Sequence, residues 1–134
     1  MSDSNKAVVG QLYERINAGD LEVVDDVISD DFVEHEEFPG LEPSKSGVRK
    51  MFEVFHAAFN GARFEVDDMI GEGDKVCVRG RLTGTHQAEF MGIPSSGHAI
   101  NVRLGDYFRL DNGIIVEHWG VMDTGALMQQ LTGG

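Results

Sequence analysis

The sequence predicts an α+β fold in which a curved, mainly antiparallel sheet wraps around amino-terminal helices and encloses a cone-shaped pocket. Apolar residues recur at helical spacing in the first part of the chain, and in the second part they alternate with polar residues as in strands. Helices followed by a run of strands are typical of this class, because the helices cover one face of the sheet. With 134 residues and a hydrophobic content of 41%, we expect a single domain spanning residues 1–134.

Two helices are expected at the amino terminus. Ser4 can cap the first, over residues 5–18, in which apolar residues recur at four-residue spacing. A shorter second helix covers residues 21–28, and a brief extended segment follows at residues 31–35. Residues 36–45 contain two prolines and a glycine, which disfavour regular structure. We expect this stretch to form a lid.

A third helix and four long strands are expected to follow. The helix begins at Ser46 and carries one apolar stripe: Val48, Met51, Phe52, Phe55 and Phe59. Alternating apolar and polar residues then predict strands over residues 63–72, 76–85, 98–110 and 114–122. Residues 124–131 are expected to close the chain as a short helix.

The composition excludes several classes of partner and of chemistry. With 11 basic and 23 acidic residues the net charge is −12, which disfavours binding to nucleic acid or to an anionic membrane. No apolar run approaches the roughly 20 residues needed to span a bilayer. Cys77 is the only cysteine and the amino terminus lacks a signal-peptide pattern, so we expect a cytoplasmic protein without disulfides. The sequence has no nucleophile elbow, phosphate loop or dinucleotide fingerprint, so no cofactor is expected.

Asp106 is the most unusual residue of the predicted sheet. The two-residue period of a strand puts it on the same buried face as four apolar side chains: Ile100, Val102, Leu104 and Phe108. A buried carboxylate is costly unless it has a partner or stays protonated. The next strand carries His118, and a histidine with its ordinary pKa near 6.5 can transfer protons at neutral pH. We predict that Asp106 and His118 form a catalytic acid/base pair; the alternative is a buried polar pair without a catalytic role.

The length of the hairpin loop decides which side chain faces Asp106. A two-residue loop of Asn112 and Gly113 would place Asp106 opposite Trp119. A three-residue loop with a bulge at Gly113 would place it opposite His118 instead. We favour the three-residue loop, because it gives the carboxylate a hydrogen-bonding neighbour and turns Trp119 away from the pocket.

Further side chains are candidates for the pocket. His35 precedes the expected lid and is a third catalytic candidate at the pocket mouth, although it could equally be a solvated loop residue. The residues expected to bind substrate are His86, Val102, Leu104, Phe108, Met122 and Phe55. His86 is expected at the pocket mouth, although it could instead be a surface residue at the end of its strand. A metal site built from the histidines and Asp106 is not expected, because they lack a close-spaced ligand pair.

Several stretches share a pattern with known proteins. They are residues 17–21 and 30–35, residues 84–86 and 90–94, and residues 105–109, 111–113, 117–119 and 129–131. In this order and spacing they resemble the SnoaL-like polyketide cyclase branch of the nuclear-transport-factor-two-like superfamily, over nearly the whole chain. The resemblance implies a cofactor-independent cyclase, isomerase or hydrolase that acts by proton transfer on a small apolar carbonyl compound.

The resemblance also carries expectations for single positions. The acid/base aspartate of the cyclases falls at Gly120, which favours an alternative function, a non-catalytic module that binds small hydrophobic ligands. In the ketosteroid isomerases of the superfamily, a proton-donating aspartic acid matches Asp106. The isomerases' oxyanion tyrosine aligns with Leu12, leaving Tyr13 one position away, and their general base falls near His35.

Members of this superfamily commonly pair through the open face of the sheet, so the resemblance implies a homodimer. The face that would meet the partner carries Arg79, Arg81, Thr83, Arg103, Tyr107 and Trp119.

Overall fold

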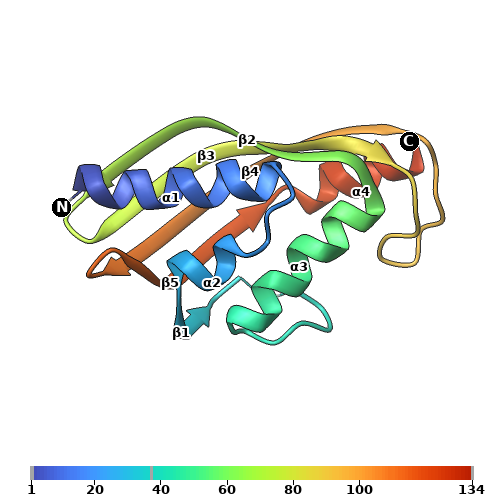
Figure 1. Ribbon diagram of the computed structural model, residues 1–134. Helices are drawn as coiled ribbons and strands as arrows, with labels where there is room; N and C mark the ends of the chain where they lie inside the picture. The colour runs from blue at the N-terminus through green and yellow to red at the C-terminus, as the bar shows by residue number, and fades with distance from the viewer. Residues whose placement is uncertain (1, 37, 134) are drawn as a thin grey trace.

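The computed structural model describes residues 2–36 and 38–133 and consists of a curved sheet with helices packed against it (Figure 1). The elements are, in chain order, α1 (Ser2–Asn17), α2 (Val23–Val27), β1 (Ile28–Glu34), α3 (Lys45–Ala58), β2 (Phe59–Glu72), β3 (Lys75–His86), β4 (Ala99–Asp111), β5 (Ile114–Met122) and α4 (Thr124–Thr132). The strand order is β1-β5-β4-β3-β2, in which β1 pairs in parallel with β5 and the other neighbours are antiparallel. The predicted α+β fold with a mainly antiparallel sheet is confirmed.

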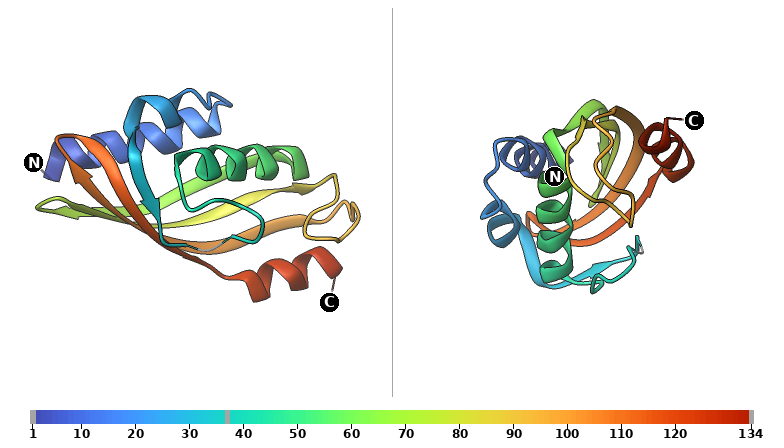
Figure 2. Two further views of the ribbon diagram at one scale, coloured as in Figure 1. Left: turned by 90° about the horizontal axis from the view of Figure 1, so that it is seen from below. Right: turned by 90° about the vertical axis from the view of Figure 1, so that its right-hand side faces the viewer.

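The helices α1 and α3 lie on the same side of the curved sheet (Figure 2). Their apolar residues recur every three or four positions, so each helix buries one stripe against the strands. Phe55 of α3 is fully buried and contacts the rings of Phe38, Phe59, Phe64 and Phe90, with centroid distances of 5.5 to 6.2 Å. This aromatic cluster fixes α3 above the sheet. None of the described helices is both long and apolar enough to cross a membrane.

Several expected element boundaries are wrong, among them the start of the first helix and the end of the third. The first helix begins at Ser2, so Ser4 lies inside it and does not cap it. Phe59 begins β2 and does not end α3, so this strand starts earlier than expected. The register of β2 against β3 shifts between Asn60 and Arg63, where Gly61 has a φ of +67°. An irregularity of this kind interrupts the alternation of apolar and polar residues, which hid the start of the strand.

The hairpin between β4 and β5 differs from both expected arrangements. Asn112 and Gly113 both have positive φ and form a two-residue turn, so the favoured three-residue loop is wrong. The register then shifts between Arg109 and Leu110, because β5 contains one extra residue there. As a result Asp106 pairs with Gly120, and neither His118 nor Trp119 is directly opposite it. His118 remains on the same inner face as Asp106, as a diagonal neighbour.

Truncation of Phe55 tests the aromatic cluster. We expect Phe55→Ala to lower the free energy of unfolding by about 3–5 kcal/mol, because the substitution removes a fully buried ring and leaves a cavity. Phe55→Leu, which keeps more of the apolar volume, should cost less. Urea unfolding followed by circular dichroism measures both variants, and equal stabilities of Phe55→Ala and the wild type would contradict the packing described.

Candidate active site

A cavity of about 140 Å³ lies between the concave face of the sheet and helices α1 and α3. Its walls are mostly apolar, and the polar side chains that line it are Tyr13, Glu34, Glu36, Asp106, His118 and Thr124. An apolar cavity of this size is comparable to an engineered one of about 150 Å³ that binds benzene. The cavity therefore suits a molecule with about one ring, brought next to a small group of ionisable side chains.

His118 lies between two carboxylates. Its Nε2 is 2.7 Å from Asp106 Oδ1, and its Nδ1 is 2.5 Å from Glu34 Oε1. All three side chains are mostly buried, with 11% to 14% of their surface exposed. Parallel pairing of β1 with β5 brings Glu34 directly beside His118, while β4 supplies Asp106. The predicted contact between Asp106 and His118 is present in the structure, together with a second carboxylate that was not predicted.

Tyr13 extends this chain of hydrogen bonds. Its hydroxyl, on the buried face of α1, donates to Asp106 Oδ2. Burial, followed by the charge of Asp106, raises the pKa of Tyr13 well above its ordinary value, so the phenol stays neutral and acts as a donor. Asp106 thus accepts from two donors, one on each oxygen.

The charge of His118 is set by its two carboxylates. Burial disfavours the imidazolium, but the hydrogen bonds and charges of Asp106 and Glu34 outweigh it and raise the pKa of His118 to about 10. At neutral pH His118 is therefore a fixed cation. This pKa differs from the ordinary value on which the expected proton transfer rested, because the sequence did not reveal the second carboxylate.

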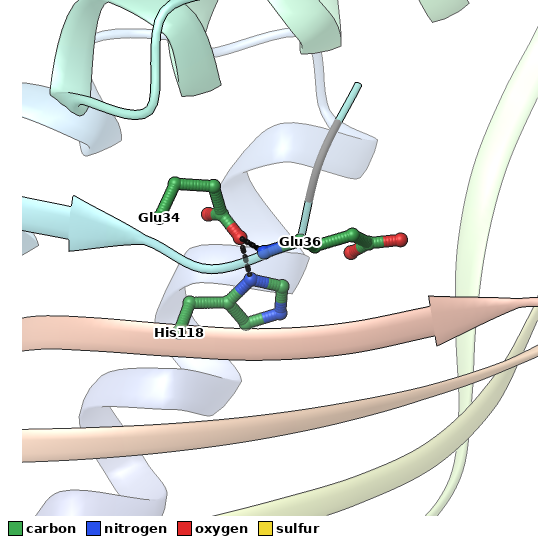
Figure 3. Close-up of side chains that lie close together, drawn as sticks. All are labelled: Glu34, Glu36 and His118. Atoms are coloured by element: carbon green, nitrogen blue, oxygen red, sulfur yellow. Dashed lines mark hydrogen bonds and ion pairs between the residues drawn. The ribbon is translucent and has the colours of Figure 1, made fainter. Parts of the chain in front are cut away.

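Glu36 is a third carboxylate at the site, in the loop after β1 (Figure 3). Its backbone N–H donates to Glu34 Oε1 at 3.1 Å, which ties the loop to the ion pair. Burial, followed by the charges of Asp106 and Glu34, raises the pKa of Glu36 from 4.5 to about 7, against the opposing charge of His118. The charge of Glu36 therefore changes near neutral pH.

Six of the nine predicted site residues line the cavity: Phe55, Leu104, Asp106, Phe108, His118 and Met122. Val102 is fully buried in the core and does not line it.

His35 and His86 lie outside the cavity wall. The ring of His35 stacks on Trp119 with a centroid distance of 4.5 Å, and its Nε2 is 2.8 Å from Glu117 Oε2. It lines an adjoining outer groove instead, because neighbouring residues of an extended segment point in opposite directions. His86 is fully buried, with its Nδ1 2.9 Å from Ser96 Oγ, so the expectation of a side chain at the pocket mouth is wrong.

Sequence reasoning missed Tyr13, Glu34 and Glu36 as site residues. The alternation that turns His35 outward also turns both neighbouring glutamates inward, and this was the signal that could have found them. Tyr13 lies on the apolar stripe of α1 with Val9 and Ile16, where a hydroxyl needs a partner. The resemblance to the isomerases had placed their tyrosine at Leu12.

The glutamates and His118 are close enough to be considered as metal ligands. One possible ligand atom from each of Glu34, Glu36 and His118 lies within 4.8 Å of the others. Both ring nitrogens of His118 are engaged with carboxylates, and an imidazolium has no lone pair to offer a metal. The arrangement fits a hydrogen-bonded ion cluster better than a coordination site.

The protonation of His118 can be measured directly. We expect its NMR ring signals to titrate near pH 10 and not near 6.5, and Glu34→Gln to lower that midpoint by removing one of the two negative charges beside the ring. Because the pKa is raised on folding, the stability that His118 contributes is complete below 6.5 and is lost as the pH rises through about 10. Glu14→Gln, an exposed change on α1, is the control. A midpoint near 6.5 in the wild type would refute the fixed cation.

The chain is similar to known proteins over nearly its whole length. A family model described as SnoaL-like polyketide cyclase matches residues 6–131. Among solved structures, AclR from Streptomyces galilaeus is 30% identical with a TM-score of 0.89, and the alignment covers 100% of this chain and 99% of AclR. IdmH from Streptomyces antibioticus is 30% identical with a TM-score of 0.84, and the alignment covers 96% of this chain and 98% of IdmH. TsrD from Streptomyces laurentii is 26% identical with a TM-score of 0.87, and the alignment covers 96% of this chain and 95% of TsrD.

No curated protein matches the sequence. The chain belongs to the SnoaL-like polyketide cyclase family, as the resemblance in its sequence predicted.

Proposed function

We propose that this protein is a cofactor-independent enzyme that moves protons on a small, apolar, carbonyl-type substrate. The observation that carries the proposal is the chain of Tyr13, Asp106, His118 and Glu34 on the wall of an otherwise apolar cavity. Burying ionisable groups in apolar surroundings costs free energy of folding. Such groups are found most often at catalytic sites. The family supports a small-molecule enzyme, and a polyketide cyclase activity has been suggested for IdmH.

The chain offers hydrogen-bond donors to a carbonyl oxygen. The hydroxyl of Tyr13 and the Nε2–H of His118 both point at Asp106, next to the cavity. A substrate oxygen that enters there competes with Asp106 for these donors. When a proton leaves the carbon beside the carbonyl, negative charge grows on that oxygen, and the donors and the imidazolium stabilise it. The apolar walls formed by Phe55, Leu104 and Phe108 exclude water and strengthen this interaction.

Replacement of Asp106 tests the proposal with a one-ring ketone. We expect the wild type to accelerate the exchange of the α-protons of cyclohexanone in D₂O, followed by ¹H NMR. Asp106→Asn should reduce the rate by about 100-fold or more, because it removes the charge that holds Tyr13 and His118 in place. Asp31→Asn, an equal change at an exposed position, should keep the wild-type rate.

Two outcomes would overturn the proposal. The first is a wild type that binds cyclohexanone but exchanges its protons no faster than buffer, and this would favour the non-catalytic ligand-binding alternative. The second is an unchanged exchange rate and an unchanged affinity in Asp106→Asn.

We also propose that two copies pair through the outer face of the sheet. On this face Tyr107 and Trp119 pack edge to face, with ring centroids 5.3 Å apart, and more than a third of each side chain is exposed. Exposed aromatic side chains of this kind are enriched in interfaces. We expect sedimentation equilibrium to show a dimer that Trp119→Arg weakens. A wild type that stays monomeric at all concentrations would contradict the pairing.

A further inference from the structure

Gly120 leaves a space on the inner face of β5 that the carboxylate of Glu36 fills. A Cβ atom at position 120 would lie 2.3 Å from Glu36 Oε1, 2.7 Å from His118 Cε1 and 2.9 Å from Asp106 Oδ1. Real Cβ atoms essentially never approach that closely. Gly120 is not among the glycines with positive φ, so its backbone would accept another residue. The need for glycine here is therefore one of space, and the space is taken by Glu36.

Glu36 differs from the other two carboxylates in its contacts. Asp106 accepts from Tyr13 and His118, and Glu34 accepts from His118 and from the backbone of Glu36. Within residues 2–36 and 38–133, the side chain of Glu36 has no hydrogen-bond partner. It lines both the cavity and the outer groove, so it can meet a bound molecule on one side and exchange protons with water on the other.

We propose that Glu36 is the catalytic residue that takes a proton from the substrate and returns it, and that Gly120 admits it to the cavity. The inference rests on the proposed function and names the base within the same site. In the forward step the C–H bond beside the carbonyl breaks, its electron pair forms the enolate with the charge on oxygen, and the proton binds a carboxylate oxygen of Glu36. Return of that proton to a carbon of the enolate leaves Glu36 ionised again. No redox partner takes part.

Charged side chains on three strands shift the pKa of Glu36. Asp106 on β4 and Glu34 on β1 favour the protonated form together with burial, and His118 on β5 favours the carboxylate. Among residues 2–36 and 38–133, Tyr13 on α1 is a further titratable neighbour, and it stays neutral. The pKa of about 7 that results leaves a useful fraction of Glu36 ionised at neutral pH and makes its protonated form a competent acid.

The base can be tested with 5-nitrobenzisoxazole, a small flat aromatic compound. A base removes its C3 proton, the C–H electron pair forms the nitrile, and the N–O bond breaks to give a coloured cyanonitrophenolate. We expect the wild type to accelerate this reaction with a rate that rises with pH through a midpoint of about 7, because the carboxylate is the active form. Glu36→Gln should lower the rate by about 100-fold or more. Glu14→Gln makes the same change at an exposed position and should have no effect.

A double-mutant cycle tests the role of Gly120. Gly120→Ala should displace Glu36 and slow the reaction, and adding Glu36→Gln should then cost little more. Circular dichroism and probe affinity show whether each variant is folded and still binds. A folded Glu36→Gln variant that keeps the wild-type rate would overturn the assignment of the base, and independent effects of the two substitutions would overturn the role of Gly120.

These outcomes are separable from failure of the proposed function. If cyclohexanone exchange depends on Asp106 but Glu36→Gln leaves the rate of the benzisoxazole reaction unchanged, the enzyme proposal stands and the assignment of the base fails. If the wild type accelerates the benzisoxazole reaction through Glu36 but does not exchange cyclohexanone, Glu36 is a base in an accessible cavity and the carbonyl chemistry fails.

Discussion

The imidazolium of His118 between Asp106 and Glu34 is the interaction on which the site depends. It joins three strands, because Glu34 comes from β1, Asp106 from β4 and His118 from β5. Removing one member of such a buried group leaves an uncompensated charge, so the members hold one another in place. Tyr13 adds the first helix to the same network. Rigidity here serves the site, since donors fixed before the substrate arrives do not need to reorganise during the reaction.

The cavity combines this fixed group with one adjustable carboxylate. His118 keeps its charge and Tyr13 stays neutral near pH 7, whereas Glu36 titrates there. When neighbouring ionisable groups in one site have very different pKa values, they can take separate acid and base roles. Gly120 contributes by having no side chain, because any Cβ would collide with Glu36. The resemblance to the cyclases places an aspartate at position 120. In this protein the space beside Gly120 is filled by the carboxylate of Glu36, from the loop after β1.

The local patterns of the sequence were sufficient for most of the fold. Helical spacing located α1 and α3, and alternation located the four long strands and placed Asp106 on the inner face with Leu104 and Phe108. The boundaries failed where the regular pattern breaks, at the register shift near Gly61 and at the extra residue in β5. Irregularities of this kind do not follow from periodicity, because a bulge is set by the strand opposite.

The sequence by itself determined the fold class, the family and the inward position of Asp106 and His118, because these follow from periodicity and from motifs along the chain. Only the tertiary structure decided which groups meet there. Tyr13 is 93 residues from Asp106, and Glu34 is 84 residues from His118. Their contacts require the parallel pairing of β1 with β5 and the exact register of β4 with β5. Pairing between distant segments depends on how whole elements pack, and local sequence carries little information about it.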